Sequence, residues 1–545
     1  MKMIKNAIKS LFLTLFCMVN LYAQPKTGSW GDQGNGTYIN PVLNADYSDP
    51  DVIRVDDKYY MVCSEFQFMG MPVLESEDMV NWKIVTQIYS HLDFPDYDSV
   101  NSYSNGSWAP AIRYHAGKFW VYFCTIPEGL FMCSAEKAEG PWNITLVKKI
   151  EKWEDPCPFW DEDGKAYLVH SQHGAGPIII HKMSEDGTQL LDNGVTVYTG
   201  PVAEGPKIFK RGKYYYISIP EGGVSTGWQT ILRSKSIYGP YEKKVVLETG
   251  STSINGPHQG ALVDTPDGEW WFYHFQQSGA LGRVVHLQPV QWAEDWPVIG
   301  VDIDRNGIGE PVYVWKKPAT GKTLPVHAPQ TDDDFRASTL GLQWQFNHNP
   351  ENTAWSLVKN PRCLSLNALK SDSFLRAKNT LTQKIMGTSG ETVVRLDLSQ
   401  FAEGQKAGLC IFSSMYNLFG IYRTEGKNYL FFENNEALFD QPQQLPDGTK
   451  VRINYFDTSK NYFEKQPIST KVIYLKVKLD FLSNVNHFYY STDNKHFIPF
   501  GKDFHAVFGF WKGARLGLFN YNELKEDGVA LFSQFKYDYD GPKKD

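Results

Sequence analysis

Five segments of the chain repeat one pattern of strand, polar turn and strand. They read DPDVIRVDDKYYMV from Asp49, WAPAIRYHAGKFWVYF from Trp108, DPCPFWDEDGKAYLVH from Asp155, EGPKIFKRGKYYYISI from Glu204 and HQGALVDTPDGEWWFYHF from His258. The first residue of each segment, here called its leader, precedes a short apolar strand, and successive leaders are 59, 47, 49 and 54 residues apart. Repeats of this length built from short antiparallel strands are typical of β-propellers, so we expect five blades around a central channel.

The rest of the chain predicts a second all-β unit. Segments with helical periodicity are nearly absent, which disfavours a TIM barrel or a helical solenoid. We expect the propeller to span residues 24–318 and a linker rich in Pro, Thr and Lys to span residues 319–332. Residues 333–545 contain short strands, such as ETVVRLDL and VIYLKVKLD, at the spacing of a sandwich. The predicted fold class is all-β, a five-bladed β-propeller followed by a jelly-roll β-sandwich.

Residues 1–23 have the pattern of a signal peptide, with three lysines, an apolar run from Leu11 and a small-residue exit at Leu21-Tyr22-Ala23. We therefore expect an exported protein, periplasmic or extracellular after the peptide is removed. Cys17 follows Phe16, where a lipoprotein signal has a small residue, so lipid anchoring is disfavoured. No other apolar run is long enough for a transmembrane segment. The remaining 51 basic and 61 acidic residues disfavour nucleic acid as a partner.

The leaders are candidates for chemistry because the innermost strand of every blade lines the channel, so equivalent positions converge. Three of the five leaders are acidic, although turn formation alone has no need of a repeated carboxylate. Inverting hydrolysis of a glycosidic bond uses a carboxylate base and a carboxylic acid roughly 6.5 to 9.5 Å apart. The acid must hold its proton near neutral pH, so we expect its pKa to be raised by burial or by a neighbouring carboxylate.

The segments NPVLNADYSDPDVIRVDDKYYMV, EDPCPFWDEDGKAYLVH and AEGPKIFKRGKYYYISI resemble the acidic motifs of glycoside hydrolase family 43, and the resemblance runs from about Asn40 to Lys317. That family comprises five-bladed propellers that act as inverting β-xylosidases, α-L-arabinofuranosidases and some endo-acting enzymes. The resemblance implies that Asp49 is the general base and Glu204 the general acid. It implies that Asp155 tunes the pKa of the acid and orients the substrate.

Four other acidic residues near the first motif compete with Asp49 for the role of base: Asp46, Asp51, Asp56 and Asp57. Asp51 falls in the predicted strand, and Asp56 and Asp57 fall in its turn. We expect only Asp49 to be in register with Asp155 and Glu204.

The resemblance also implies substrate contacts. Trp108 and Phe66 match aromatic residues that wall the sugar pocket, although Phe66 would serve equally as a core residue. Arg283, in LGRVVHLQPV, matches an arginine that can donate hydrogen bonds to sugar hydroxyls and keep Asp155 ionised. His258 matches a histidine on the axis, close to a bound calcium ion or a water cluster, and a role without metal stays open.

No organic cofactor is required for this chemistry, whereas a structural calcium ion stays open. The segment DIDRNGIGE, from Asp302, begins like a calcium loop, but Tyr313 occupies the position that needs an acidic residue, so a hairpin turn is favoured. His170 and His173, in HSQH, are expected to be strand and loop residues rather than metal ligands. Candidate calcium ligands in the sandwich are Asp332, Asp333, Asp334 and Asp538.

The C-terminal part resembles the concanavalin-like domain of family 43 exo-acting enzymes, in which a loop narrows the propeller pocket. The best candidate for that loop is FGFWKG, residues 508–513, with Phe510 as the contact, and a core aromatic cluster is the alternative. The expected function is that of an exported inverting exo-glycosidase. It would release β-D-xylose or α-L-arabinofuranose from plant cell-wall polysaccharides or oligosaccharides. An endo-acting arabinanase or xylanase and a carbohydrate-binding propeller without catalysis are the alternatives.

Overall fold

The computed structural model describes residues 28–98, 102–435, 438–444, 450–456 and 461–542. Within these ranges the regular structure is strand, apart from four short 3-10 helices, η1 (Pro95–Asp98), η2 (Gly279–Leu281), η3 (Asn352–Ala354) and η4 (Phe374–Arg376). None of the described helices is long and apolar enough to cross a membrane. The signal peptide expected at residues 1–23 lies outside the described residues.

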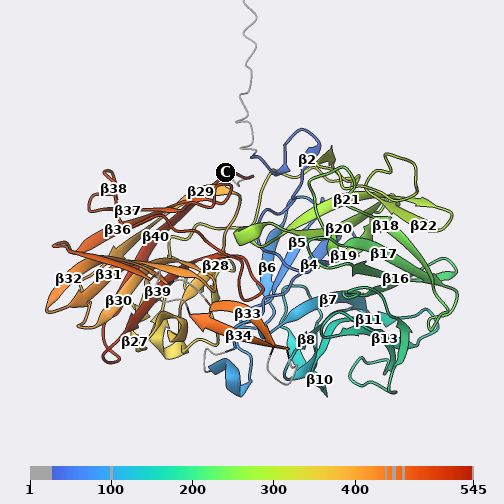
Figure 1. The fold of residues 1–545 in the computed structure, drawn as a ribbon, viewed down its shortest axis with the longest axis horizontal. Coiled ribbons are helices and arrows are strands. Elements are labelled where there is room, and N and C mark those ends of the chain that lie inside the picture. Colours follow the sequence, from blue (N-terminus) through green and yellow to red (C-terminus); the bar gives the residue numbers. More distant parts are fainter. Residues whose placement is uncertain (1–27, 99–101, 436–437, 445–449, 457–460, 543–545) are drawn as a thin grey trace, which may run out of the picture.

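Five four-stranded antiparallel sheets form the blades of a propeller, the blue to green half of Figure 1. Blade one contains β3 (Asp51–Val55), β4 (Lys58–Val62), β5 (Pro72–Ser76) and β6 (Lys83–Gln87). Blade two contains β7 (Trp108–His115), β8 (Lys118–Thr125), β9 (Gly129–Ala135) and β10 (Asn143–Lys149). Blade three contains β11 (Trp153–Trp160), β12 (Ala166–Gln172), β13 (Ile178–Met183) and β14 (Val195–Tyr198).

Blade four contains β15 (Lys207–Arg211), β16 (Tyr214–Glu221), β17 (Trp228–Ser234) and β18 (Glu242–Leu247). Blade five contains β19 (His258–Asp264), β20 (Trp270–Gln277), β21 (Arg283–Ala293) and β22 (Trp296–Ile299). The first strand of each blade is the innermost, and β3 lies next to both β7 and β19, so the ring of blades is closed. All five predicted strand pairs are therefore present as the inner hairpins of five blades.

A small sheet joins the beginning of the described chain to the segment that follows blade five. It contains β1 (Gly31–Asp32), β2 (Thr37–Ile39) and β23 (Val314–Lys316). Lys317, directly after β23, forms ion pairs of 2.6 Å with both Asp32 and Asp78. These contacts connect the two ends of the ring to blade one.

The C-terminal part is a β-sandwich of two sheets, orange and red in Figure 1. The first sheet contains β24 (Gln345–Phe346), β28 (Leu381–Lys384), β39 (Arg515–Asn522), β30 (Gln405–Phe412), β31 (Tyr416–Thr424), β32 (Lys427–Asn435), β35 (Tyr462–Pro467) and β27 (Leu369–Lys370). The second contains β25 (Trp355–Ser356), β26 (Leu364–Asn367), β40 (Val529–Tyr539), β29 (Ser389–Asp397), β36 (Val472–Asp480), β37 (His487–Ser491) and β38 (Ile498–Pro499). A separate hairpin pairs β33 (Leu438–Gln444) with β34 (Lys450–Phe456).

Burial along the strands shows which sheet faces the propeller. Every residue of β30 and β39 is buried, whereas buried and half-buried residues alternate along β36. Alternation is expected of a strand with one face toward solvent, and continuous burial of a strand covered on both faces. The first sheet therefore packs against the second sheet on one face and against the propeller on the other, as Phe68 packing edge-on against Phe412 shows. The predicted all-β fold is confirmed.

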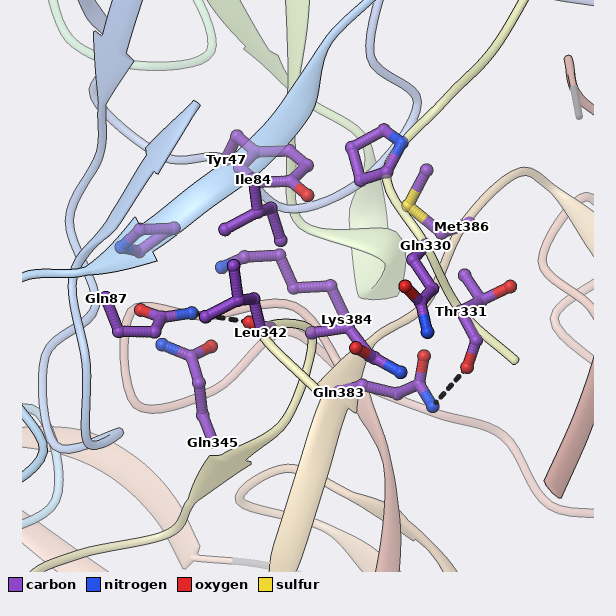
Figure 2. A pocket seen from close by; sticks show the side chains of 13 residues that line it. Tyr47, Ile84, Gln87, Gln330, Thr331, Leu342, Gln345, Gln383, Lys384 and Met386 are labelled. Carbon is purple, nitrogen blue, oxygen red and sulfur yellow. Dashed lines mark hydrogen bonds between the residues drawn. The ribbon is translucent and has the colours of Figure 1, made fainter. Parts of the chain in front are cut away.

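The propeller and the sandwich are in direct contact, and side chains from both line one small pocket between them. Figure 2 shows a small pocket there, with Tyr47, Ile84 and Gln87 on the propeller side and Leu342 and Lys384 on the other. Its volume is about 10 Å³, which is room for about one water molecule. Gln87 donates a hydrogen bond of 2.7 Å to the carbonyl of Leu342 across it. Close packing of this kind lets side chains of the sandwich reach defined positions in the propeller.

Candidate active site

Each innermost strand has a residue with left-handed backbone within its first three residues or within two residues before it. These residues are Asp49 (φ 54°), Ala109 (φ 30°), Asp155 (φ 57°), Gly205 (φ 60°) and Gln259 (φ 39°). Four of them are not glycine, and non-glycine residues in this region carry strain that clusters at functional sites. The strand starts of the five blades are therefore equivalent in backbone conformation and in position around the channel.

Contrary to our expectation, the three carboxylates are not all in the same register. Asp49 and Asp155 both occupy the left-handed position, but Glu204 lies one residue before it, in register with Glu154. The sequence pattern missed the offset because β-bulges shift the pairing at these strand starts, between Glu154 and Cys157 for example. Glu204 thus enters the channel from a different backbone position than the two aspartates.

Asp49 is held by three neighbouring side chains at the start of blade one. Ser64 Oγ donates a hydrogen bond of 2.6 Å to Oδ2, and Ser48 Oγ donates one of 2.9 Å to the same oxygen. Arg283 Nη1 lies 3.1 Å from Oδ1 and completes an ion pair. Asp49 is only 4% exposed. The carboxylate is therefore fixed in orientation at the channel wall.

The ion-pair partner of Arg283 is Asp49, not the expected Asp155. We expected it to keep Asp155 ionised, but its guanidinium pairs with Asp49 and also donates a hydrogen bond of 3.0 Å to Ser48 Oγ. Arg283 leaves β21 of blade five at its first residue, which places it on the Asp49 side of the channel. The competing Asp51 lies inside β3 and pairs with Arg113 at 2.7 Å instead.

Asp155, in blade three, accepts hydrogen bonds from the beginnings of blades four and five. The backbone N–H of Gly205 donates to Oδ2 at 2.7 Å, and Gln259 Nε2 donates to the same oxygen at 3.2 Å. Burial raises the pKa of Asp155 well above its usual value, and the charges of Glu154 and Glu204 raise it further. The carboxyl group of Asp155 is therefore the member of this cluster that retains a proton most readily.

Glu204 is paired with His258, the leader of the next blade. His258 Nε2 lies 2.5 Å from Glu204 Oε1, and the His258 side chain is 1% exposed. Burial is the largest single influence and would raise the pKa of Glu204, but the hydrogen bond and charge of His258, together with the charges of Arg283 and His173, lower it overall. The sequence led us to expect a raised pKa here. In the structure the raised pKa belongs to Asp155, because His258 faces Glu204 and not Asp155.

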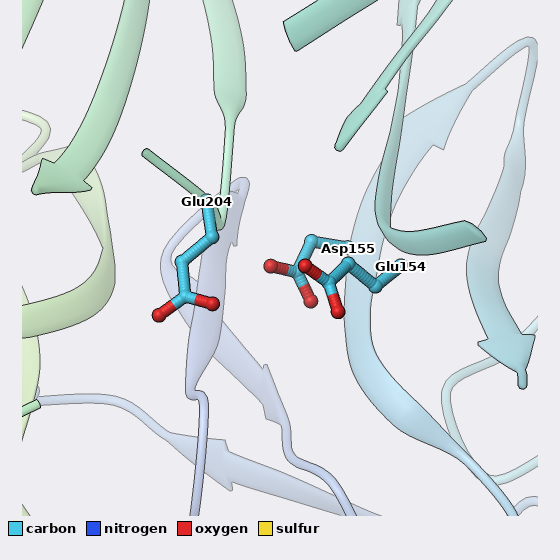
Figure 3. Close-up of side chains that lie close together, drawn as sticks. All are labelled: Glu154, Asp155 and Glu204. Atoms are coloured by element: carbon cyan, nitrogen blue, oxygen red, sulfur yellow. The ribbon is translucent and has the colours of Figure 1, made fainter. Parts of the chain in front are cut away.

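Figure 3 shows Glu204 reaching toward Asp155 and Glu154, which lie side by side. One oxygen from each of the three lies within 4.8 Å of the others. Among the described residues, these three carboxylates form the group whose spacing would suit a metal ion. Protein groups already contact some of its oxygens: Oδ2 of Asp155 accepts from Gly205 and Gln259, and Oε1 of Glu204 pairs with His258. His258, for which a metal-binding role and a role without metal both stayed open, turns Nε2 to Glu204.

Glu154 and His173 are site residues that the sequence patterns did not identify. Glu154 accepts a hydrogen bond of 3.0 Å from the Ala175 N–H and pairs with His173 Nδ1 at 3.0 Å. The hydrogen bond to Glu154 raises the pKa of His173. The only local signal was the acidic residue directly before Asp155. We had expected His173 to be a loop residue, and it follows β12 at the rim of the site.

Aromatic side chains border the carboxylates. Trp108 packs edge-on against Phe66, His173 and Trp511, with ring centroids 5.2, 5.4 and 5.8 Å apart. Trp108 is half-buried, as a pocket wall requires, whereas Phe66 is 2% exposed and lies behind Trp108. Of the two aromatic residues expected to wall the pocket, Trp108 presents a surface to a ligand and Phe66 supports it.

A tight turn from the sandwich reaches this aromatic group. Gly509 and Lys512 exchange backbone hydrogen bonds of 3.0 and 3.1 Å, and both residues between them are left-handed, Phe510 with φ 58° and Trp511 with φ 62°. Phe510, the expected contact, stacks on Tyr103 with centroids 4.5 Å apart. Trp511 instead packs on Trp108 and faces the Arg283 guanidinium at 5.8 Å. The turn therefore reaches the site through the residue after the one we expected.

The other segments considered for calcium use their carboxylates in turns. Asp302 accepts backbone hydrogen bonds from Asn306 at 3.1 Å and Gly307 at 2.9 Å. Asp333 accepts from the Phe335 N–H at 2.7 Å and from Trp344 Nε1 at 2.9 Å. Asp302 and Asp333 therefore each have hydrogen-bond donors from the protein.

Comparison with known proteins gives a consistent assignment. The profile of Glycosyl hydrolases family 43 matches residues 38–297, and that of the Beta xylosidase C-terminal Concanavalin A-like domain matches residues 332–538. A protein of Xylanibacter ruminicola, whose name marks it as a candidate beta-xylosidase, is 50% identical over 497 residues, 91% of this chain and 88% of its own. The beta-xylosidase of Formosa agariphila is 41% identical over 582 residues, 96% of this chain and 93% of its own. The crystal structure of a family 43 protein from Bacillus licheniformis is 26% identical, with a TM-score of 0.77 over 92% of this chain and 99% of that chain.

Proposed function

Because the chain belongs to family 43 of the glycosyl hydrolases, we propose that it is an inverting exo-β-xylosidase that removes terminal β-D-xylose from xylan-derived oligosaccharides. The observation that carries this proposal is the set of carboxylates that three blades bring to one end of the channel, Asp49 on one side and Glu204 with Asp155 on the other. The names of two relatives that share 50% and 41% of their aligned residues with the chain support xylose as the sugar.

Asp49 is the general base. Its fixed orientation between Ser64 and Arg283 lets it take a proton from a water molecule as that water attacks the anomeric carbon. Glu204 delivers a proton to the departing glycosidic oxygen at the same time, so no covalent intermediate forms. Attack on the face opposite the leaving group converts a β-linked xylose into α-xylose.

The proton of the acid is held by a pair of carboxyl groups. Asp155 and Glu204 offer oxygens within 4.8 Å of each other, and the raised pKa of Asp155 favours the retention of one proton by the pair. The proton has to move only from Asp155 to Glu204 when a substrate weakens the contact between Glu204 and His258. In this account Asp155 stores the proton and His258 controls where it lies.

The sandwich supports exo action. Trp511 lies beside Trp108 and Arg283, so it narrows the space above the carboxylates on one side. A site narrowed on one side in this way favours the end of a chain over its middle. We also propose export, on the signal-peptide pattern of residues 1–23.

Turnover of two chromogenic substrates tests the proposal. Purified protein should hydrolyse 4-nitrophenyl β-D-xylopyranoside with a kcat/KM at least about tenfold above that for 4-nitrophenyl α-L-arabinofuranoside, a preference of about 1.4 kcal/mol. A reversed preference would make the chain an arabinofuranosidase. Binding of xylo-oligosaccharides without turnover of either substrate would make it a carbohydrate-binding propeller, and early release of oligomers from xylan would make it endo-acting.

A further inference from the structure

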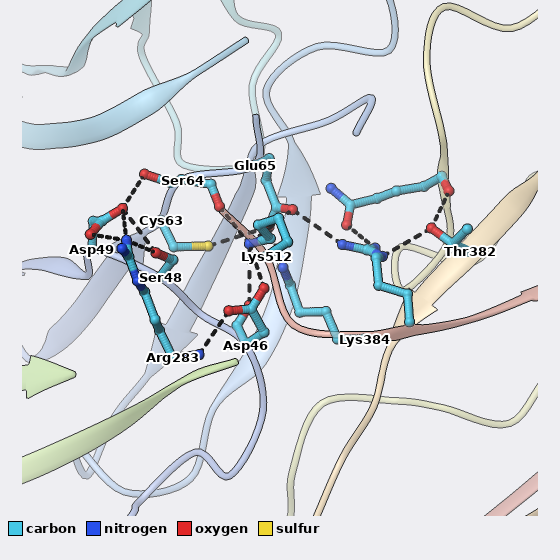
Figure 4. A network of polar contacts seen from close by, with 12 residues as sticks. Asp46, Ser48, Asp49, Cys63, Ser64, Glu65, Arg283, Thr382, Lys384 and Lys512 are labelled. Carbon is cyan, nitrogen blue, oxygen red and sulfur yellow. Dashed lines mark hydrogen bonds and ion pairs between the residues drawn. The ribbon is translucent and has the colours of Figure 1, made fainter. Parts of the chain in front are cut away.

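We propose that Lys512, which the sandwich contributes, is a positioning residue for the general base Asp49. This inference rests on the hydrolase function proposed above and goes beyond it, because it gives the sandwich a role in the chemistry itself. Lys512 follows Trp511 in the turn that reaches the site, and its side chain is 1% exposed. Figure 4 shows its ammonium group between the carboxylates of Asp46 and Glu65.

Two short routes connect Lys512 to Asp49. In the first, Lys512 Nζ donates a hydrogen bond of 2.9 Å to the carbonyl of Ser64, whose hydroxyl donates one of 2.6 Å to Asp49 Oδ2. In the second, Lys512 Nζ forms an ion pair of 2.9 Å with Asp46 Oδ2. The other oxygen of Asp46 accepts a hydrogen bond of 2.9 Å from the backbone N–H of Arg283. Arg283 in turn pairs with Asp49.

The backbone around Lys512 is anchored to the same part of blade five. The N–H of Ala514 donates a hydrogen bond of 2.8 Å to the carbonyl of Ala280, three residues before Arg283. A Cβ atom on Gly513 would lie 2.3 Å from the carbonyl oxygen of Leu281, so only glycine fits at this close approach. The position of the ammonium group is therefore defined relative to Arg283 and does not depend on the flexible lysine side chain alone.

The base needs such support because its own backbone is strained. Asp49 has φ 54°, which a non-glycine residue keeps only when surrounding contacts determine it. Lys512 is connected to two of the three partners of Asp49. It donates a hydrogen bond to Ser64 directly, and it reaches Arg283 through its ion-pair partner Asp46. Removing the ammonium group would leave Asp46, 2% exposed, without its buried counter-charge and would release both partners.

Lys384 provides a matched control. It also comes from the sandwich, is buried in the same network and forms an ion pair of 2.5 Å with Glu65 Oε1. Its ion-pair partner is Glu65 rather than Asp46, so Lys384→Met removes a buried cation from the interface without removing a contact to Ser64 or Asp46. Lys512→Met removes a cation of the same kind together with those contacts.

The test compares kcat and KM of wild type, Lys512→Met and Lys384→Met on xylobiose and on 4-nitrophenyl β-D-xylopyranoside. We expect Lys512→Met to lower kcat by about 10- to 100-fold on both substrates, because a base displaced by about 1 Å loses that much. KM should stay within about threefold and Lys384→Met should keep kcat within about threefold, since neither change removes substrate binding or acid catalysis. A merely structural lysine would not give this separation of kcat from KM.

Three results would overturn the inference: kcat of Lys512→Met within about threefold of wild type, equal losses in both lysine variants, or a loss confined to xylobiose, which would indicate an effect on the acid. If Lys512→Met does not accumulate as folded protein, Asp46→Asn interrupts the same route from the propeller side, and retained kcat in that variant would also overturn it. A wild-type chain inactive on both substrates would instead refute the proposed function.

Discussion

Asp49 and Glu204 lie on strand starts that are equivalent in fold but enter the channel from adjacent backbone positions. Asp49 occupies the left-handed residue itself, with a short side chain and three fixed donors. Glu204 directly precedes the left-handed residue of its own blade, Gly205. Its side chain has one more methylene group than that of Asp49, and its partner is His258. A base that must hold a water molecule in line suits the rigid position, and an acid that must exchange a proton with Asp155 suits the longer side chain.

The assignment of the acid predicts how activity depends on the leaving group. Glu204→Gln should lower kcat/KM on xylobiose by about 10² to 10⁴, because the departing sugar oxygen needs a proton. On 4-nitrophenyl β-D-xylopyranoside the loss should be much smaller, since nitrophenolate leaves without one. Asp49→Asn is the matched control and should lose activity on both substrates alike. Equal losses for Glu204→Gln on both substrates would show that Glu204 is not the acid.

The contact between His258 and Glu204 predicts the direction of a pH shift. His258 lowers the pKa of Glu204, so His258→Phe should raise that pKa and keep the acid protonated to higher pH. The basic limb of the kcat/KM profile on xylobiose should therefore move to higher pH. Phenylalanine keeps a planar aromatic ring at this position but cannot form the hydrogen bond. A basic limb that stayed in place or moved to lower pH would contradict this role for His258.

At the scale of elements, the blades could be predicted because every inner hairpin carries its own local signals, such as the polar turn at Asp56-Asp57 between two apolar strands. The acidic leaders Asp49, Asp155 and Glu204 could be found for the same reason. The turn from Gly509 to Lys512 could not, since its two left-handed positions hold Phe510 and Trp511 where hairpin rules expect Asn or Gly. Which of the two aromatic side chains lies beside Trp108 depends on that conformation, so the sequence alone could not identify Trp511.

The turn predicts different consequences for its two aromatic residues. Trp511 is 42% exposed and touches Trp108, so Trp511→Ala should raise KM for xylotriose by about tenfold, the loss of one aromatic contact, with little change in the midpoint of thermal unfolding. Phe510→Ala should leave KM nearly unchanged and lower the midpoint of thermal unfolding, because Phe510 stacks on Tyr103 and holds the turn in place rather than the substrate. Steady-state kinetics and thermal melts of the two variants check this. Unchanged KM in Trp511→Ala would remove Trp511 from the pocket.

At the scale of the whole molecule, propeller and sandwich share one buried network of charges. It includes Asp46 and Glu65 from the propeller and Lys384, Lys512 and Arg515 from the sandwich. Lys512 and Ser64 are 448 positions apart in the chain, and no repeat or motif relates them. Such a network depends on how two complete units pack together, so local patterns in the sequence could not predict it.

The network predicts a pH dependence of stability. Burial lowers the pKa of Lys384 from 10.5 to about 8. Between these values the unfolded chain binds a proton at Lys384 that the folded chain does not, so this residue makes the fold more stable as pH rises through the window. The free energy of unfolding of wild type should therefore rise relative to that of Lys384→Met by about 2 kcal/mol from pH 8 to pH 10.

Thermal melts of both proteins across that range measure the difference. Lys512→Met serves as the control, because the pKa of Lys512 is raised and its charge persists through the window. A constant difference between wild type and Lys384→Met would contradict the lowered pKa.

The anomeric form of the first sugar released tests the central claim most directly. If Asp49 activates water on the face opposite the oxygen that Glu204 protonates, proton NMR recorded during hydrolysis of xylobiose should show α-xylose appearing first and β-xylose growing in by mutarotation. Initial release of β-xylose would mean retention through a covalent intermediate, and the assignment of Asp49 as a base that acts on water would then be wrong.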